Sequence, residues 1–328
     1  MNWQTLTSVR AQYRLRREED GTGHERKSGP HAKFSFGAHQ SVMVKEAISL
    51  LDLKKGEVVV DATAGVGGHS EAILKAARVQ LLSIDADKKA VEASTKRLAH
   101  YKSRAKVIQG NFRDLDAILR RENIDLVDKF LFDLGWNREQ LEAGKGFSFL
   151  LDEPLNMSYG EKPASGFTAA EILNSWKEKV IADVLYGYGE ERFARPIAKA
   201  IVARREILPY TTTIELVETI RDAVPARTRH GKIHVATRTF QALRIAVNDE
   251  LGSIEKGLKS AWAHLKPGGR IVVITFHSIE DRLVKKTFAA FAKKGGTLLV
   301  KKPLTASRAE ITHNSSARSA KMRAIEKE

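Results

Sequence analysis

The sequence predicts an α/β fold, in which a parallel, doubly wound sheet is interrupted by a helical insertion. Three observations support this prediction. An apolar strand, a glycine-rich turn and a helix follow one another over 58–77, and strands and helices then alternate as far as Asp133. The alternation stops after Gly135, and a strongly apolar strand pattern returns only at 270–276. A chain of 328 residues has room for both parts.

Each element of the sheet follows from a local pattern. Apolar, β-branched runs predict strands, and amphipathic runs between them predict helices. The expected strands are 57–61, 81–85, 106–109, 129–133 and 270–276, with weaker candidates at 297–300 and 320–325. The expected helices are 69–77, 87–101 and 113–122. Alternation at this spacing implies parallel strands joined by helices.

The interrupting stretch reads first as loop and then as helices. Its helical part carries three capping-box spacings, Thr168/Glu171, Ser175/Glu178 and Thr212/Glu215. The chain therefore divides into an extension at 1–38, a sheet domain at 39–135 and 234–328, and an inserted, mainly helical domain at 136–233. We expect the extension to be basic and flexible, and the cleft between the two domains to hold the functional site.

Charge is the outstanding property of the composition, with a net charge of +15 and a pI near 9.8. Residues 282–328 carry 12 Lys and Arg against 3 Asp and Glu. Arg192, Arg195 and Lys199 share one face of a predicted helix. The excess favours a polyanionic partner, nucleic acid before an anionic membrane, over a merely solvated surface.

Composition also excludes several classes of protein. The chain has no cysteine, which excludes disulfides, thiolate metal sites and cysteine nucleophiles. It has no apolar run long enough to cross a membrane and no apolar signal segment. We therefore expect a cytoplasmic protein.

The glycine-rich turn after the first strand predicts a ribose-bearing cofactor. Its glycines let the backbone approach a ligand, and Asp85 at the end of the next strand can hold ribose hydroxyls. The turn alone does not distinguish a dinucleotide from S-adenosylmethionine. Asp61 favours the second ligand, because acids attract its sulfonium cation whereas a dinucleotide brings a pyrophosphate to the helix N-terminus. His69 either faces this ligand or caps the helix.

Further candidates follow the fourth strand and lie on a late helix. Asp133 either accepts a hydrogen bond from an amine that is to be methylated or contacts the cofactor. Trp136 either stacks on an extracted base or anchors a loop. The helix pattern at 234–250 sets a buried stripe against a polar side that is either solvated or directed at a substrate. The stripe is Phe240, Leu243, Val247 and Leu251, and the polar side is Gln241, Arg244 and Asn248.

The segment 266–269, Lys-Pro-Gly-Gly, is either an ordinary helix-to-strand turn or the turn by which class I methyltransferases enter their fifth strand. Taken together, the segments resemble the ribosomal RNA small subunit methyltransferase H family, the 16S rRNA cytosine-N4 methyltransferases. The resemblance runs from His39 to near Lys327. It rests on long motifs such as DATAGVGGHSEAIL, YGEERFARPIAKAIV, KIHVATRTFQALRIAVNDEL and LKPGGRIVVITFHSIEDRLVKK.

The resemblance implies a class I, Rossmann-like fold with an inserted helical substrate-recognition domain, and S-adenosylmethionine as methyl donor. The implied acceptor is the N4 amine of a cytosine near the decoding region of small-subunit ribosomal RNA, within a 30S particle. The family's cofactor contacts fall on Gly67, Gly68, His69, Asp85, Phe112, Asp133 and Gln140. The candidates on the acceptor side are Asp133, His277 and Asn248, since the family offers no single catalytic base to transfer. We expect no metal and no membrane partner, and the sequence leaves monomer and homodimer open.

Two loops and one position depart from the family pattern. After Asp133-Leu-Gly the family continues Val-Ser-Ser-Pro, whereas 136–139 read Trp-Asn-Arg-Glu. The family's Pro-Leu-Asp-Met-Arg-Met-Asp is replaced at 154–160 by Pro-Leu-Asn-Met-Ser-Tyr-Gly, which loses two carboxylates, and Ser41 stands where Pro is usual. The same chemistry on a different RNA base or site is therefore an alternative. So is a non-catalytic, RNA-binding ribosome assembly factor.

Overall fold

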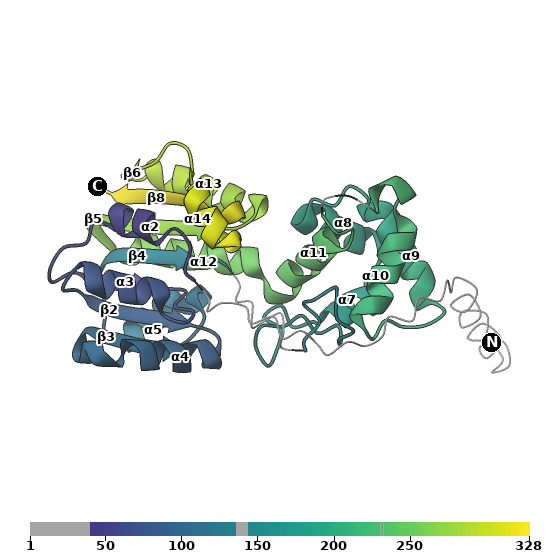
Figure 1. Cartoon of the computed structure of the whole chain (residues 1–328), viewed down its shortest axis with the longest axis horizontal. Helices are drawn as coiled ribbons and strands as arrows, with labels where there is room; N and C mark the ends of the chain where they lie inside the picture. Colours follow the sequence, from purple (N-terminus) through teal and green to yellow (C-terminus); the bar gives the residue numbers. More distant parts are fainter. Residues whose placement is uncertain (1–39, 136–143, 230, 232) are drawn as a thin grey trace.

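The structure is a computed structural model, and it describes residues 40–135, 144–229, 231 and 233–328. These residues form two lobes, a sheet with its covering helices and a group of helices from the middle of the chain (Figure 1). The predicted extension at 1–38 lies outside the described residues, as do Trp136 and Gln140. No helix in the described ranges is long and apolar enough to cross a membrane.

An eight-stranded sheet forms the first lobe, with the strand order β3-β2-β1-β4-β5-β8-β6 and β7 paired to β8. The parallel strands are β1 (Val58–Asp61), β2 (Gln80–Asp85), β3 (Ala105–Gln109), β4 (Val127–Asp133) and β5 (Leu265–Thr275). The antiparallel part consists of β6 (Gly296–Leu298), β7 (Leu304–Thr305) and β8 (Lys321–Lys327). The predicted α/β class is confirmed, and only the two-residue strand β7 lacked a sequence signal.

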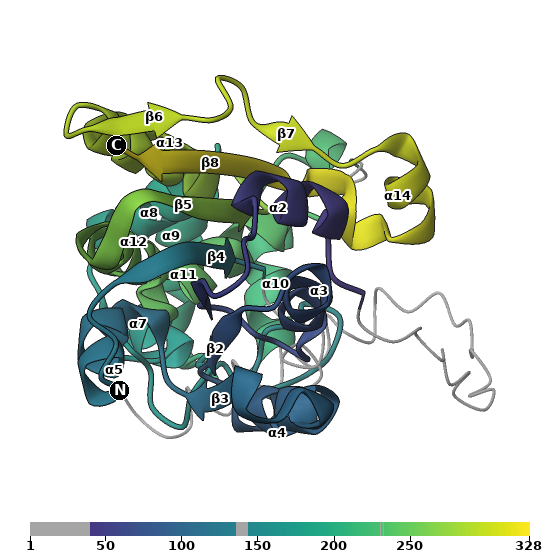
Figure 2. The same cartoon turned by 90° about the vertical axis from the view of Figure 1, so that its left-hand side faces the viewer.

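Helices cover both faces of the sheet because successive strand residues point to opposite sides. Val59 and Leu131 belong to one buried cluster, and Val60 and Phe130 belong to the other. The first cluster is covered by α2 (Val44–Leu51), α3 (Gly68–Ala76), α4 (Lys88–Leu98) and α14 (Arg308–His313). The second is covered by α5 (Leu115–Arg121), α12 (Glu250–His264) and α13 (Ser278–Ala292). Figure 2 shows α2 and α3 on one side of the strands and α5 and α12 on the other.

The second lobe has a hydrophobic core of its own, built from residues 147–247. Its helices are α7 (Ala169–Ser175), α8 (Glu178–Gly189), α9 (Ala194–Arg205), α10 (Thr213–Ala223) and α11 (Thr237–Asn248). The predicted capping boxes at Thr168/Glu171 and Thr212/Glu215 are confirmed. The one at Ser175/Glu178 is wrong, because Ser175 ends α7 and donates its hydroxyl to the Glu171 carbonyl at 2.5 Å, so Lys177 precedes α8 without a side-chain cap.

Helix α11 packs in the helical lobe, whereas the sequence places 234–248 with the sheet. Its buried residues Phe240, Leu243 and Val247 belong to the helical core. The helix expected to continue through 250 ends at Asn248, because Asp249 adopts a left-handed conformation with φ of 45°. Leu251 is therefore part of α12 rather than of the predicted stripe. The chain returns to the sheet lobe at this bend.

Candidate active site

The glycine-rich turn joins β1 to α3 at the carboxyl edge of the sheet. Gly65 has φ of 52° and donates its N–H to Asp85 Oδ2 at 2.8 Å. The N–H of Asp87 donates to the other oxygen, Asp85 Oδ1, at 2.9 Å. Burial raises the pKa of the Asp85 carboxyl, and these two bonds act in the opposite direction. Since a carboxylate offers about four lone-pair sites, Asp85 can still accept from the hydroxyls of a ligand.

Gly68 is required by the close approach of the segment that precedes α2. A Cβ at position 68 would collide with Ser41 Oγ. Gly67 has φ of 82°, and a Cβ there would lie 3.2 Å from Ser94 Cβ. A larger residue at either position therefore has to displace a serine side chain, and at position 67 it would also adopt a strained left-handed conformation.

His69 is buried with 3% of its surface exposed, and it joins that segment to β4. Its Nε2 lies 2.9 Å from the carbonyl oxygen of Val42, which requires a proton on Nε2. Its Nδ1 lies 3.4 Å from Asp133 Oδ2. Of the two readings from the sequence, the helix cap is wrong, because His69 lies within α3, whose N-cap is Gly67. Contact of His69 with a ligand stays a prediction.

The carboxylate of Asp61 stabilises the glycine-rich turn. It is fully buried, and it accepts hydrogen bonds from Ser70 Oγ at 2.6 Å and from the Thr63 N–H at 3.2 Å. Burial raises the pKa of the Asp61 carboxyl, while His69 and Ser70 lower it. Thr63 Oγ1 in turn accepts from the N–H of Asp133 at 2.6 Å. The turn and the end of β4 therefore hold each other in place.

Phe112 begins a short 3₁₀ helix, η2 (Phe112–Asp114), directly after β3. Its ring meets Phe132 edge to face, with the ring centroids 5.8 Å apart. It also lies against α12, where a Cβ on Gly257 would come within 2.8 Å of Phe112 Cδ2. The ring is thus fixed and half-buried at the carboxyl edge, and its contact with an adenine stays a prediction.

Asn248, predicted on the acceptor side, is buried and holds a loop. Its Nδ2 donates to the carbonyls of Met157 at 2.8 Å and Arg244 at 2.9 Å, and its Oδ1 accepts from the Tyr159 N–H at 2.9 Å. Both amide protons and one oxygen site are therefore engaged within the protein. Asn248 positions the 157–159 backbone, and the solvated position that was one reading of its pattern is wrong.

Tyr159 and Glu250 form a network with Arg244 that sequence reasoning missed. The Tyr159 hydroxyl donates to Glu250 Oε1 at 2.9 Å, and Arg244 donates from Nε to Oε1 at 2.8 Å and from a terminal nitrogen to Oε2 at 3.0 Å. Burial, with a smaller contribution from Glu250, raises the pKa of Tyr159 well above its ordinary value. Burial alone would lower the pKa of Arg244, but Glu250, together with Tyr159 and Glu280, raises it above its ordinary value. The only signal was a Tyr inside the altered 154–160 loop.

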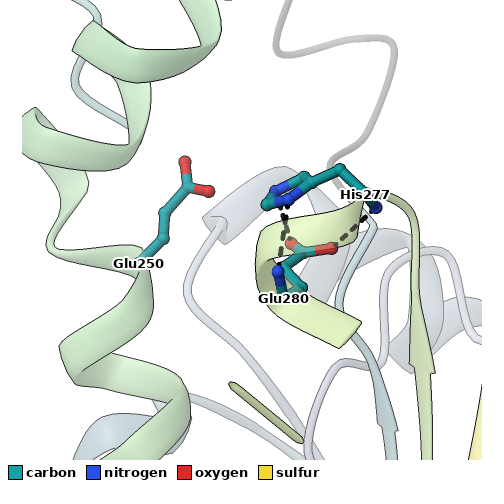
Figure 3. Close-up of side chains that lie close together, drawn as sticks. All are labelled: Glu250, His277 and Glu280. Atoms are coloured by element: carbon teal, nitrogen blue, oxygen red, sulfur yellow. Dashed lines mark hydrogen bonds and ion pairs between the residues drawn. The ribbon is translucent and has the colours of Figure 1, made fainter. Parts of the chain in front are cut away.

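His277 is the N-cap of α13 and forms a capping box with Glu280 (Figure 3). Its Nδ1 accepts from the Glu280 N–H at 3.3 Å, which puts the ring proton on Nε2. This buried Nε2 lies 3.2 Å from Glu280 Oε1, close enough for an ion pair but not aligned for a hydrogen bond. Figure 3 shows Glu250 reaching from α12 toward the same ring.

One ligand atom each from Glu250, His277 and Glu280 lies within 4.8 Å of the others, which is a possible arrangement for a metal ion. Both oxygens of Glu250, however, already accept from Arg244. The guanidinium therefore supplies the positive charge that this pair of carboxylates needs, and we assign no metal to the cluster.

The predicted residues thus fall into two groups at one edge of the sheet. His69 contacts Asp133, and Asp85 is bonded to the turn between them. His277 follows β5, and residue Ile274 of that strand pairs with Asp133. Glu250 lies close to His277 and is bonded to Tyr159, whose backbone is held by Asn248. The side chain of Asn248 is engaged in hydrogen bonds within the protein and is not available to a ligand at this edge.

Comparison with known proteins gives consistent matches. The sequence profile of the MraW methylase family matches residues 37–328. The ribosomal RNA small subunit methyltransferase H of Carboxydothermus hydrogenoformans is 47% identical over 88% of this chain and 98% of its own length, and that of Geotalea uraniireducens is 44% identical over the same shares. A solved rRNA methylase from Streptococcus thermophilus is 11% identical, covers 88% of this chain and 99% of its own, and has a TM-score of 0.41, too low for any conclusion.

Proposed function

The chain belongs to the MraW methylase family, and on this premise we propose that it transfers a methyl group from S-adenosylmethionine to the N4 amine of a cytosine in small-subunit ribosomal RNA, near the decoding region. The family resemblance expected from the motifs is confirmed. The cytosine, its N4 atom and its position in a 30S particle belong to the proposal, and so does the assignment of the helical lobe to substrate recognition.

The observation that carries the proposal is the joining of His69, Asp133 and the glycine turn at one edge of the sheet. We call the turn 61–69, Asp85, Phe112 and Asp133 the donor side. Its chemistry fits S-adenosylmethionine, because carboxylates surround a turn that could hold a sulfonium cation, Asp85 has lone pairs left for a ribose, and Phe112 offers a fixed apolar face. When bound, the cofactor supplies a methyl group on a positively charged sulfur. Gly67, Gly68, His69 and Gln140 complete the proposed contacts.

Asp133 acts on the acceptor amine in this proposal. The lone pair of a cytosine amine is delocalised into the ring, so an acceptor on its N–H makes the nitrogen a better nucleophile. Asp133 stands at the end of β4, with its backbone held by Thr63 and its carboxylate facing His69. These contacts fix the orientation of the Asp133 carboxylate. The alignment of the amine with the methyl carbon contributes the larger part of the catalysis.

We call Tyr159, Arg244, Asn248, Glu250, His277 and Glu280 the acceptor side. The Nε2–H of His277 is buried beside Glu280 without an aligned hydrogen bond among the described residues, and it would reach the base only after a movement that exposes it. Asn248 contributes by holding the Tyr159 backbone. Of the three basic residues predicted on one helix face, Arg195 and Lys199 lie on α9 and Arg192 lies in the turn before it, and all three are exposed for phosphates.

The deciding assay combines the purified protein, labelled S-adenosylmethionine and small subunits that lack the modification. Label in the RNA is expected, and mass spectrometry should locate it on the N4 atom of one cytosine. Label absent from the RNA despite calorimetric binding of S-adenosylmethionine would overturn the proposal, and absence of that binding would support the assembly-factor alternative.

A second candidate keeps the chemistry and changes the base or site. The altered loop at 154–160 supports it, because Tyr159 from that loop contacts Glu250 beside His277. A methyl group located on another nucleotide by the same mass spectrometry would favour this candidate.

A further inference from the structure

Helices α12 and α13 leave a groove between them on the side of the sheet opposite to α2, α3 and α4 (Figure 2). The groove has a volume of about 480 Å³. Its apolar lining includes Leu283 and the stacked rings of Trp262 and Phe291, whose centroids are 4.7 Å apart. The groove lies outside both the donor side and the acceptor side.

The walls of this groove are positively charged. Lys259, Lys286 and Lys294 line it and are exposed, and the single acidic residue in its lining is Glu255. Glu255 is engaged by Lys259, with Oε1 2.6 Å from Nζ. Lys286 and Lys294 form no ion pair with any residue that the structure describes. With Glu255 and Lys259 paired, the groove keeps the positive charge of Lys286 and Lys294 and favours an anionic occupant.

The spacing of the lysines favours a chain of phosphates over a single anion. Lys286 lies on α13, and Lys294 lies two residues beyond the end of this helix at Ala292. The six residues from 286 to 292 alone correspond to about 9 Å along a helix axis, so successive phosphates of a strand can each meet one of the two lysines. An apolar floor between basic walls also suits the sugar and base faces of single-stranded nucleic acid.

Helix α13 connects the proposed site to the groove. This helix begins at Ser278, directly after His277, and passes Arg282 before it reaches Lys286. We propose that the groove binds single-stranded RNA that flanks the target nucleotide, with phosphates on Lys259, Lys286 and Lys294. The proposal rests on the proposed function in taking RNA as the polyanion, and it adds a second contact surface for that RNA.

The test compares two triple variants with the same change in charge. The groove variant carries Lys259→Gln, Lys286→Gln and Lys294→Gln. The control carries Lys55→Gln, Lys89→Gln and Lys96→Gln, which are exposed residues before β1 and on α4, on the other side of the sheet. Fluorescence anisotropy measures the affinity for a labelled single-stranded fragment of small-subunit RNA at several salt concentrations, without S-adenosylmethionine.

The groove variant should bind the fragment on the order of tenfold more weakly, and its slope of log affinity against log salt should be shallower by about 2, since each lost phosphate contact contributes about 0.7. The control should stay within about twofold of the wild type. Equal losses in both variants would overturn the proposal, because they would reflect diffuse charge alone.

A groove variant that binds free RNA normally but binds the assembled small subunit more weakly would also overturn it, and would identify a protein as the occupant. The binding assay needs no methyl transfer. A wild type that binds RNA through the groove yet methylates none would contradict the proposed function and leave the groove proposal standing.

Discussion

The donor side and the acceptor side of the candidate site are built in different ways. On the donor side, a backbone N–H of Gly65 is bonded to Asp85, 20 residues further along the chain and on the neighbouring strand. On the acceptor side, Tyr159 is bonded to Glu250 and Met157 to Asn248, in each case across 91 residues. The Gly65–Asp85 bond needs only the first β-α-β unit to fold, and the Met157–Asn248 bond needs the helical lobe. The Tyr159–Glu250 bond forms only where the two lobes meet.

This difference predicts which substitutions are local and which are not. A change on the donor side should affect the cofactor with little effect on RNA. A change on the acceptor side should disturb the junction of α11 and α12 and act on stability and RNA together.

The largest effect is expected for Asp85→Ala. The variant loses the two charge-assisted hydrogen bonds that we propose between the Asp85 carboxylate and the ribose hydroxyls, each contributing about 1.5–3 kcal/mol. Binding of S-adenosylmethionine should therefore weaken by more than about 100-fold. Calorimetric titration with S-adenosylmethionine measures it. The matched control is Asp87→Ala, which removes only the N-cap of α4 and should leave the cofactor affinity within about threefold. Equal losses of affinity for S-adenosylmethionine in both variants would show that Asp85 stabilises the turn rather than binding the ribose.

The next effect concerns Asp133→Asn, which keeps the shape of the side chain and removes its charge. We expect the single-turnover rate of methyl transfer to fall by about 100-fold, in the range of a lost general base. The affinity for S-adenosylmethionine should change by less than about tenfold, because the backbone of residue 133 stays bonded to Thr63. A rate within threefold of the wild type would remove Asp133 from the chemistry.

Asn248→Ala separates positioning from catalysis on the acceptor side. It leaves the Met157 carbonyl and the Tyr159 N–H buried without their partner, at a cost of about 1–3 kcal/mol each. Thermal unfolding should therefore occur several degrees lower, and KM for RNA should rise while the affinity for S-adenosylmethionine is kept. An unchanged unfolding temperature together with a lower kcat would instead make Asn248 a catalytic residue.

The same contrast explains how much the sequence could predict. The strands from β1 to β5 and the positions of Gly65 and Asp85 followed from periodicity and turn chemistry, because both act over short stretches of chain. The partnership of Arg244 with Glu250 did not, because six residues is not a helical spacing. It arises from the left-handed bend at Asp249 between α11 and α12.

The contact of His69 with Val42 and the packing of Phe112 on Gly257 were also beyond sequence reasoning. Each depends on two segments that meet only in the folded chain. His277 was predicted as a catalytic candidate and is found as the cap of α13. A histidine that caps a helix through Nδ1 keeps a proton on Nε2, but this Nε2 is buried beside Glu280, so donation to a base needs a movement that exposes it.

The smallest effect is expected at a second contact between the lobes. Glu190, at the end of α8, accepts hydrogen bonds from Ser278 at 2.8 Å and from Arg282 at 2.6 Å, and Arg282, followed by Ser278, lowers the pKa of its carboxyl. A depressed pKa contributes stability that is present above the unfolded value of about 4.3 and is lost as the pH falls through the folded value. Because Glu190 is partly exposed, Glu190→Gln should cost less than about 1 kcal/mol at pH 7 and clearly less at pH 3, measured by urea unfolding. An equal cost at both pH values would mean that the contact acts through shape rather than charge.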